Sequence, residues 1–157
     1  MQFVILPEEK EYKTFANSIK DLLTELDKNN GDLEKIGLKA LITPPDGYAL
    51  KIIKELEDLK NKRQKKGLTR VQLRKIFQEF KNIYSDYKKN KNKEKCLNEI
   101  YKLYFIISYQ RNRNLIDPDI QYLFWNLIKV LEKSNLEQFD LVMDFINALV
   151  AYIPKES

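Results

Sequence analysis

Histidine is absent from this chain of 157 residues, and cysteine occurs once, as Cys96. Without an imidazole there is no histidine metal ligand and no histidine general base, so Ser-His-Asp and Cys-His catalytic sites are excluded. One cysteine is too few for a disulfide framework or a cysteine-rich zinc site within the chain. We therefore expect no bound cofactor, and the single thiol is typical of a reducing, intracellular compartment.

Long apolar runs and turn-forming residues are also scarce. The apolar run at residues 103–107 is too short to cross a bilayer, and the run at residues 3–6 is too short for a secretory signal. These features predict a cytoplasmic protein with no membrane contact. The chain has only 4 glycines and 5 prolines, while Lys, Glu, Leu and Ile are abundant, and this composition favours helices.

Apolar residues recur with the 3.6-residue period of amphipathic helices along most of the chain. Six segments carry this pattern: residues 8–29, 46–60, 69–87, 95–112, 117–133 and 135–152. A shorter helical piece is expected over residues 32–41, and a mobile polar linker over residues 90–93. The sequence therefore predicts an all-α fold, a compact bundle of five or six helices with short connections.

Several predicted helix ends carry capping residues. Gly31 follows the first segment and is free to adopt the left-handed conformation of a C-terminal cap. Thr69 with Gln72, and Asn135 with Gln138, have the three-residue spacing of a capping box. We expect helices to begin at both boxes.

Two features resemble parts of catalytic sites but have simpler explanations. Asp117 and Asp119 form a close acidic pair, yet Pro118 between them marks a helix start, where capping explains acidic residues better than a metal site does. Cys96 lies in a lysine-rich segment that can lower its pKa, but neither a base nor a second cysteine accompanies it. The glycines are too scattered for a phosphate-binding loop. We therefore expect no enzymatic activity.

Charge is distributed unevenly along the chain. The whole sequence has 28 basic and 23 acidic residues, a net charge of +5, but residues 60–113 contain 17 of the basic residues and only 4 of the acidic ones. This basic block therefore carries +13, and its two flanks together carry −8. A block this basic attracts polyanions such as nucleic acid.

Within the basic block, cations share one face of a predicted helix. Arg70, Arg74, Gln78 and Lys81 form a stripe beside the apolar face, and the planar fork of arginine suits phosphate. Five tyrosines of the block could stack on nucleobases where they are exposed: Tyr84, Tyr87, Tyr101, Tyr104 and Tyr109. Equally, the stripe fits an ordinary solvated helix face, and the tyrosines fit core positions.

Three segments resemble a known family. They are residues 68–77, with Thr-x-x-Gln-hydrophobic-Arg-Lys; residues 109–113, with Tyr-x-x-x-Arg; and residues 145–152, Phe-Ile-Asn-Ala-Leu-Val-Ala-Tyr. Their order and spacing resemble those of the small subunit of the type III-A CRISPR effector, the Csm complex. The resemblance covers roughly residues 67–152.

The resemblance implies a non-catalytic, RNA-binding subunit. Copies would self-associate as a dimer or filament, lying along the guide RNA and the target RNA beside other subunits of this antiviral complex. Arg74 and Arg113 match the family motifs, and four further candidates for RNA binding follow from charge pattern and proximity: Arg70, Lys75, Lys81 and Arg111. The resemblance also divides the chain into an N-terminal helical extension, residues 1–66, and a small-subunit core, residues 67–157.

Other functions remain open on the residues alone. A helical protein-interaction adaptor with no nucleic-acid role would use residues 103–107 as an oligomer interface and the lysines for solubility. A helix-turn-helix DNA-binding regulator ranks lower, since no short glycine-containing turn joins two short helices in the basic block.

Overall fold

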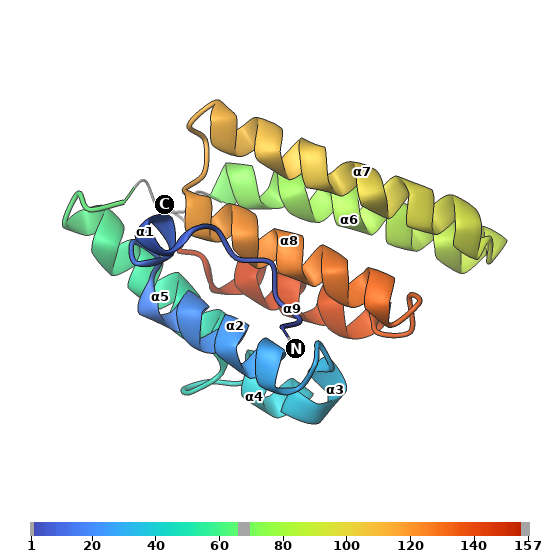
Figure 1. Cartoon of the computed structure of the whole chain (residues 1–157), viewed down its shortest axis with the longest axis horizontal. Coiled ribbons are helices and arrows are strands. Elements are labelled where there is room, and N and C mark those ends of the chain that lie inside the picture. The colour runs from blue at the N-terminus through green and yellow to red at the C-terminus, as the bar shows by residue number, and fades with distance from the viewer. Residues whose placement is uncertain (1, 66–69, 155–157) are drawn as a thin grey trace.

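The computed structural model describes residues 2–65 and 70–154, and these contain nine α-helices and no strand (Figure 1). The helices are α1 (Glu9–Tyr12), α2 (Asn17–Lys28), α3 (Leu33–Ile36), α4 (Leu38–Ile42), α5 (Tyr48–Asn61), α6 (Arg70–Asn90), α7 (Lys93–Asn112), α8 (Pro118–Lys133) and α9 (Phe139–Tyr152). The all-α prediction is confirmed. The predicted count of five or six is wrong, because three helices of 4 or 5 residues (α1, α3 and α4) accompany six longer ones.

Tertiary contacts interrupt the first predicted helix. α1 ends after Tyr12, and Ala16, with φ of −59° and ψ of 141°, is not helical just before α2. The buried ring of Phe15 packs between Tyr12 and Tyr122, with centroid separations of 5.2 and 5.8 Å. The backbone N–H of Ala16 donates to Asp119 of α8 at 2.9 Å. Contacts with α8, far away in sequence, thus replace one helical turn between α1 and α2. Local apolar periodicity could not predict this break.

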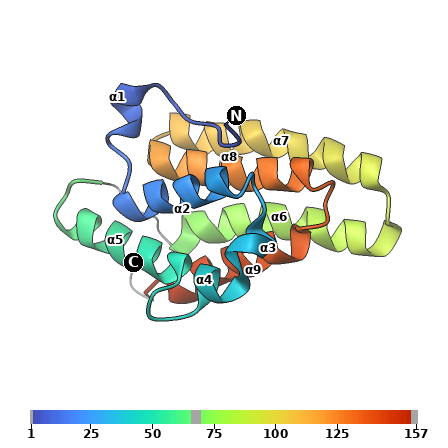
Figure 2. The same ribbon diagram turned by 60° about the horizontal axis from the view of Figure 1, so that its bottom comes forward.

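The helices form three layers (Figures 1 and 2). The α6–α7 hairpin packs on one side of α8 and α9, while α2 and α5 pack on their other side, with the short α4 beside α5 and α9. Buried side chains from all three layers form one hydrophobic cluster, whose largest fully buried members are Phe80, Phe124 and Phe145. Residues on both sides of position 66 share this core, and the division into 1–66 and 67–157 stays a prediction.

α6 and α7 form an antiparallel hairpin with a two-residue connection, Lys91 and Asn92, at the predicted polar linker. Lys91 has a left-handed conformation with φ of 57°, and the Asn92 side chain accepts the N–H of Lys95 at 3.1 Å, which caps α7. Because the helices run in opposite directions, the first turn of α6 and the last turn of α7 lie at the same end of the hairpin (Figure 1).

The predicted caps have different outcomes. Gly31 has a φ of 78° and donates its N–H to the carbonyl of Leu26 at 2.8 Å, which confirms the left-handed cap. The predicted capping box of Asn135 and Gln138 is wrong, because α9 begins only after Gln138. The Gln138 side chain instead accepts the N–H of Glu34 and donates to the carbonyl of Gly31, near the start of α3. The box at Thr69 lies outside the described residues.

Replacing Gly31 with alanine should cost about 1–3 kcal/mol more stability than replacing Gly37, because overpacking adds to the backbone strain. An added β-carbon at Gly31 would lie 2.3 Å from the Phe3 ring. Gly37 also has a positive φ, 92°, but a β-carbon there would meet nothing within 4 Å. Chemical denaturation of Gly31→Ala and Gly37→Ala measures the difference, and equal losses would contradict the steric role of Phe3.

Candidate nucleic-acid interface

Helix α6 presents three of the predicted cations to solvent. Arg74, Lys75 and Lys81 are exposed, and none forms an ion pair with a residue that the structure describes. The Lys81 ammonium lies 5.8 Å from the centroid of the Phe77 ring. Their charges are therefore available to an anionic ligand.

Arg113 follows α7 at the end of the hairpin where α6 begins. Its exposed guanidinium lies over the ring of Tyr109, 5.4 Å from the centroid, and donates to the Tyr109 hydroxyl at 3.2 Å. A stacked guanidinium keeps its charge and its remaining donors, so the contact orients Arg113 without neutralising it. The arginines of the two motif segments, Arg74 and Arg113, thus lie toward the same end of the hairpin.

Arg111 and Arg70 occupy more enclosed positions. Arg111 pairs with Glu11 of α1 at 2.9 Å and donates to Gln121 of α8 at 3.2 Å, so its guanidinium links three helices. Arg70 is half-buried, and its buried Nε has no hydrogen-bond partner among the described residues. RNA contacts by these two arginines stay predictions, and Arg111 has a structural role besides.

Three of the five tyrosines of the basic block are half-buried and pack against the hydrophobic cluster: Tyr84, Tyr87 and Tyr104. The Tyr84 hydroxyl donates to Asp140 and that of Tyr104 to Glu132, each at 2.5 Å. Burial, and then the bond to Glu132, raise the pKa of Tyr104. These tyrosines serve packing, as the core interpretation predicts.

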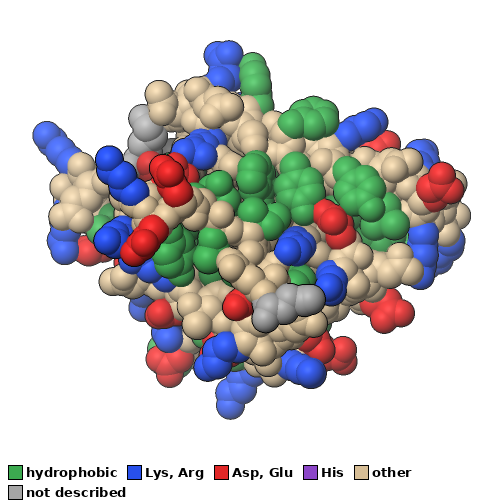
Figure 3. Space-filling model, viewed as in Figure 1, with side chains coloured by type: hydrophobic (Ala, Val, Ile, Leu, Met, Phe, Trp, Pro, Cys, Tyr) green, Lys and Arg blue, Asp and Glu red, His purple; other side chains and the backbone are tan. Residues whose placement is uncertain are grey.

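The other two tyrosines belong to an exposed row along α7. Tyr101, Phe105 and Tyr109 are 46%, 63% and 59% exposed and follow one another at four-residue steps; we call them the aromatic ridge. Leu103 and Ile107 are fully buried on the other side of the helix. Figure 3 shows hydrophobic side chains at the surface over α7. Sequence reasoning did not single out Phe105, because an apolar run does not reveal which side faces the core.

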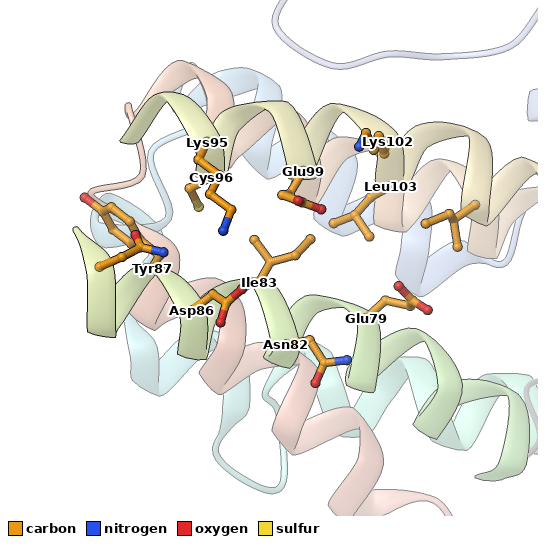
Figure 4. A pocket seen from close by; sticks show the side chains of 12 residues that line it. Glu79, Asn82, Ile83, Asp86, Tyr87, Lys95, Cys96, Glu99, Lys102 and Leu103 are labelled. Carbon is orange, nitrogen blue, oxygen red and sulfur yellow. The ribbon is translucent and has the colours of Figure 1, made fainter. Parts of the chain in front are cut away.

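A cleft of about 250 Å³ lies between α6 and α7 (Figure 4). Three of the four acidic residues of the basic block line it: Glu79 and Asp86 from α6 and Glu99 from α7. Lys95 and Lys102 of α7 line it as well. Because charges of both signs meet here, the cleft itself does not form an anion site.

Two interpretations of titratable groups are corrected. Burial, and then Glu99, raise the pKa of Cys96 to about 11, so its lysine-rich surroundings do not activate the thiol. Asp119 lies in the first turn of α8 but does not serve there as a cap: it is fully buried and pairs with Lys65 at 3.3 Å. Asp117 holds the N-cap position without a side-chain capping bond.

Comparison with protein families identifies a relationship for most of the chain. A family model described as Csm2, type III-A, matches residues 48–154. The chain belongs to this family. The resemblance to the small subunit of the type III-A Csm complex is thereby confirmed, and the other subunits of that CRISPR effector are its partners. Comparisons with curated proteins and with solved structures found no match.

The Csm2 match begins at the first residue of α5 and ends just after α9. It includes the α6–α7 hairpin and all six predicted RNA-binding residues. It also begins nearer the N-terminus than residue 67, so α5 belongs to the matched region although it precedes the motifs.

Two further properties concern only the described residues. None of the helices they form is both long enough and apolar enough to cross a membrane. No three of their cysteine, aspartate and glutamate side chains are grouped so as to hold a metal ion.

Proposed function

We propose that this Csm2-family subunit is a non-catalytic RNA-binding protein of cytoplasmic antiviral defence. Copies stack as a filament along the guide RNA and the target RNA paired with it. The phosphates are contacted by Arg74, Lys75, Lys81 and Arg113, with Arg70 and Arg111 as further candidates.

The observation that carries the proposal is the exposure of these cations on the most basic part of the chain. Arg74, Lys75, Lys81 and Arg113 are exposed, and none forms an ion pair with a described residue. They belong to the basic block of +13 that the family match encloses. The flanks are acidic, so an RNA strand is drawn to this hairpin rather than to the layer of α2 and α5.

The chemistry fits a subunit that holds RNA without reading its sequence. Guide–target base pairing supplies sequence recognition, so the protein needs contacts to phosphates and no reactive group. Lysine and arginine on rigid helices provide such contacts, and each phosphate neutralised releases counterions. Binding should therefore weaken steeply as salt rises.

The Arg74→Ala/Arg113→Ala double variant tests the site. For a single-stranded RNA, the slope of log affinity against log salt should be shallower than that of the unaltered chain by about 1.4, the value for two lost phosphate contacts. Fluorescence anisotropy of labelled RNA across a salt series measures it. The matched control is Lys35→Ala/Lys39→Ala, which removes the same charge from exposed lysines outside the basic block and should leave the slope unchanged.

Two results would count against the proposal. Equal slopes for the double variant and its control, measured alone and in the assembled complex, would remove Arg74 and Arg113 from the interface. Absence of salt-dependent RNA binding by the unaltered chain in both settings would favour the adaptor function instead.

A further inference from the structure

The aromatic ridge of α7 consists of three large side chains that are about half exposed or more. Tyr101, Phe105 and Tyr109 make no ring contact with another aromatic side chain that the structure describes. Among the described residues, Tyr109 alone of the three has a polar partner, Arg113. Large aromatic side chains on a surface cost solvation free energy unless something covers them. The ridge is therefore a candidate binding surface.

We propose that the aromatic ridge is a stacking platform for unpaired bases of single-stranded RNA. This inference rests on the proposed RNA-binding function and adds a second kind of contact to it, with the faces of bases rather than with phosphates. Paired bases are covered by their neighbours, so the ridge takes nucleotides that lie outside the guide–target duplex.

The spacing of the ridge suits successive nucleotides. At a rise of 1.5 Å per residue, rings four residues apart along an α-helix are separated by about 6 Å along the axis. The three rings therefore offer a row of faces about 12 Å long on a rigid helix. Every base has a π-face, so such a row accepts any sequence.

Cations lie alongside the ridge. Lys102 is exposed and follows Tyr101 by one residue on the side toward α6, and Arg113 stacks on Tyr109 at the C-terminal end. Single-strand binding surfaces combine aromatic platforms for bases with a positive track for the backbone, and this part of α7 supplies both. The acidic side chains of the cleft line it together with Lys102, whereas none of the three ridge residues lines it.

The composition of the ridge favours RNA over an apolar protein partner. All three of its large exposed side chains are aromatic, whereas the large aliphatic side chains that are exposed in the described part of the chain, Leu38, Val71 and Leu115, lie outside α7. The ridge also belongs to the block of +13, whose charge complements a polyanion.

The test uses a Tyr101→Leu/Phe105→Leu double variant, which keeps an apolar surface, every cation and the Tyr109–Arg113 stack. Against a short oligouridine RNA, its affinity should fall at least about five-fold, the smallest loss expected for one stacked base. The salt slope should not change, because no charge is removed. An abasic oligomer of the same length should bind both proteins equally. Leu38→Ala, an exposed apolar change on α4, is the control and should match the unaltered chain.

The outcomes separate this inference from the proposed function. If the unaltered chain binds with a steep salt dependence and the leucine variant binds equally well, the platform is overturned and the phosphate contacts stand. If the variant alters the sedimentation of the RNA-free chain but not its RNA affinity, the ridge is an interface between copies, and the platform is again overturned. If the unaltered chain binds no RNA at any salt, both proposals fail.

Discussion

Replacement of Lys65 with methionine should lower the free energy of unfolding by about 3–5 kcal/mol at pH 7, because it leaves a buried carboxylate unpaired. The side chain of Asp119 has no exposed surface, and its Oδ2 lies 3.3 Å from the Lys65 ammonium. The same oxygen accepts the N–H of Ala16, while the buried Oδ1 has no hydrogen-bond partner among the residues that the structure describes. Methionine keeps the packing of the lysine stem but cannot supply the charge.

The loss should depend on pH with a defined sign. Burial raises the pKa of Asp119 above its ordinary 3.8, although Lys65 and the N–H of Ala16 oppose the shift. A carboxyl with a raised folded-state pKa contributes stability that is complete below its unfolded pKa and is lost as pH rises through the folded one. Without Lys65 the folded pKa rises further. The difference in free energy of unfolding between Lys65→Met and the unaltered chain should therefore become smaller as pH falls toward 4.

Urea denaturation at several pH values measures both effects. Lys62→Met is the matched control: Lys62 pairs with Asp58 at 3.0 Å, but both side chains are 59% exposed, so its loss should cost less than about 1 kcal/mol. Asp119→Asn combined with Lys65→Met removes both charges and should recover most of the lost stability. A loss that stays constant with pH, or no recovery in the double variant, would contradict the buried-charge explanation.

Replacing Asn126 with alanine should lower the free energy of unfolding by about 2–4 kcal/mol, because it leaves the partly buried N–H and carbonyl of Ile5 without partners. Asn126 is fully buried on α8. Its amide accepts the N–H of Ile5 at 2.7 Å and donates to the Ile5 carbonyl at 2.9 Å. One side chain thus satisfies both backbone groups of a residue 121 positions away and holds the N-terminal segment on α8.

Denaturation combined with amide hydrogen exchange tests this anchor. In Asn126→Ala the Ile5 amide should lose protection together with the global stability. Asn147→Ala, at an exposed position of α9, should change stability by no more than about 0.5 kcal/mol. If the Ile5 amide keeps its protection in the Asn126 variant, the anchor is not Asn126.

The longer helices were predictable because each carries its own apolar period. The predictions of 95–112 and 117–133 agree closely with α7 and α8. The break before α2 was not predictable, since it depends on Phe15 packing against Tyr122 and on the Ala16 N–H reaching Asp119. A local sequence pattern does not reveal contacts between residues more than 100 positions apart.

The candidate site was predictable only where it depends on local order along the chain. Charge counts along the chain locate the basic block without any structure, and helical spacing places Arg74 and Lys81 on one stripe. Whether a cation is available depends on partners elsewhere. Arg111 and Arg113 are arginines two positions apart, and nothing local distinguishes them. Arg111 nevertheless forms an ion pair with Glu11, 100 positions away, while Arg113 is exposed.

The sequence by itself determined the helical class, the lack of histidine chemistry, the concentration of positive charge in residues 60–113 and the resemblance to the type III-A small subunit. Each of these is a property of composition or of local order. Only the tertiary structure decided that Asp119 pairs with Lys65, that Cys96 is buried and that the aromatic ridge faces outward. Burial and pairing depend on which distant segments meet, because pKa and exposure respond to everything packed around a side chain.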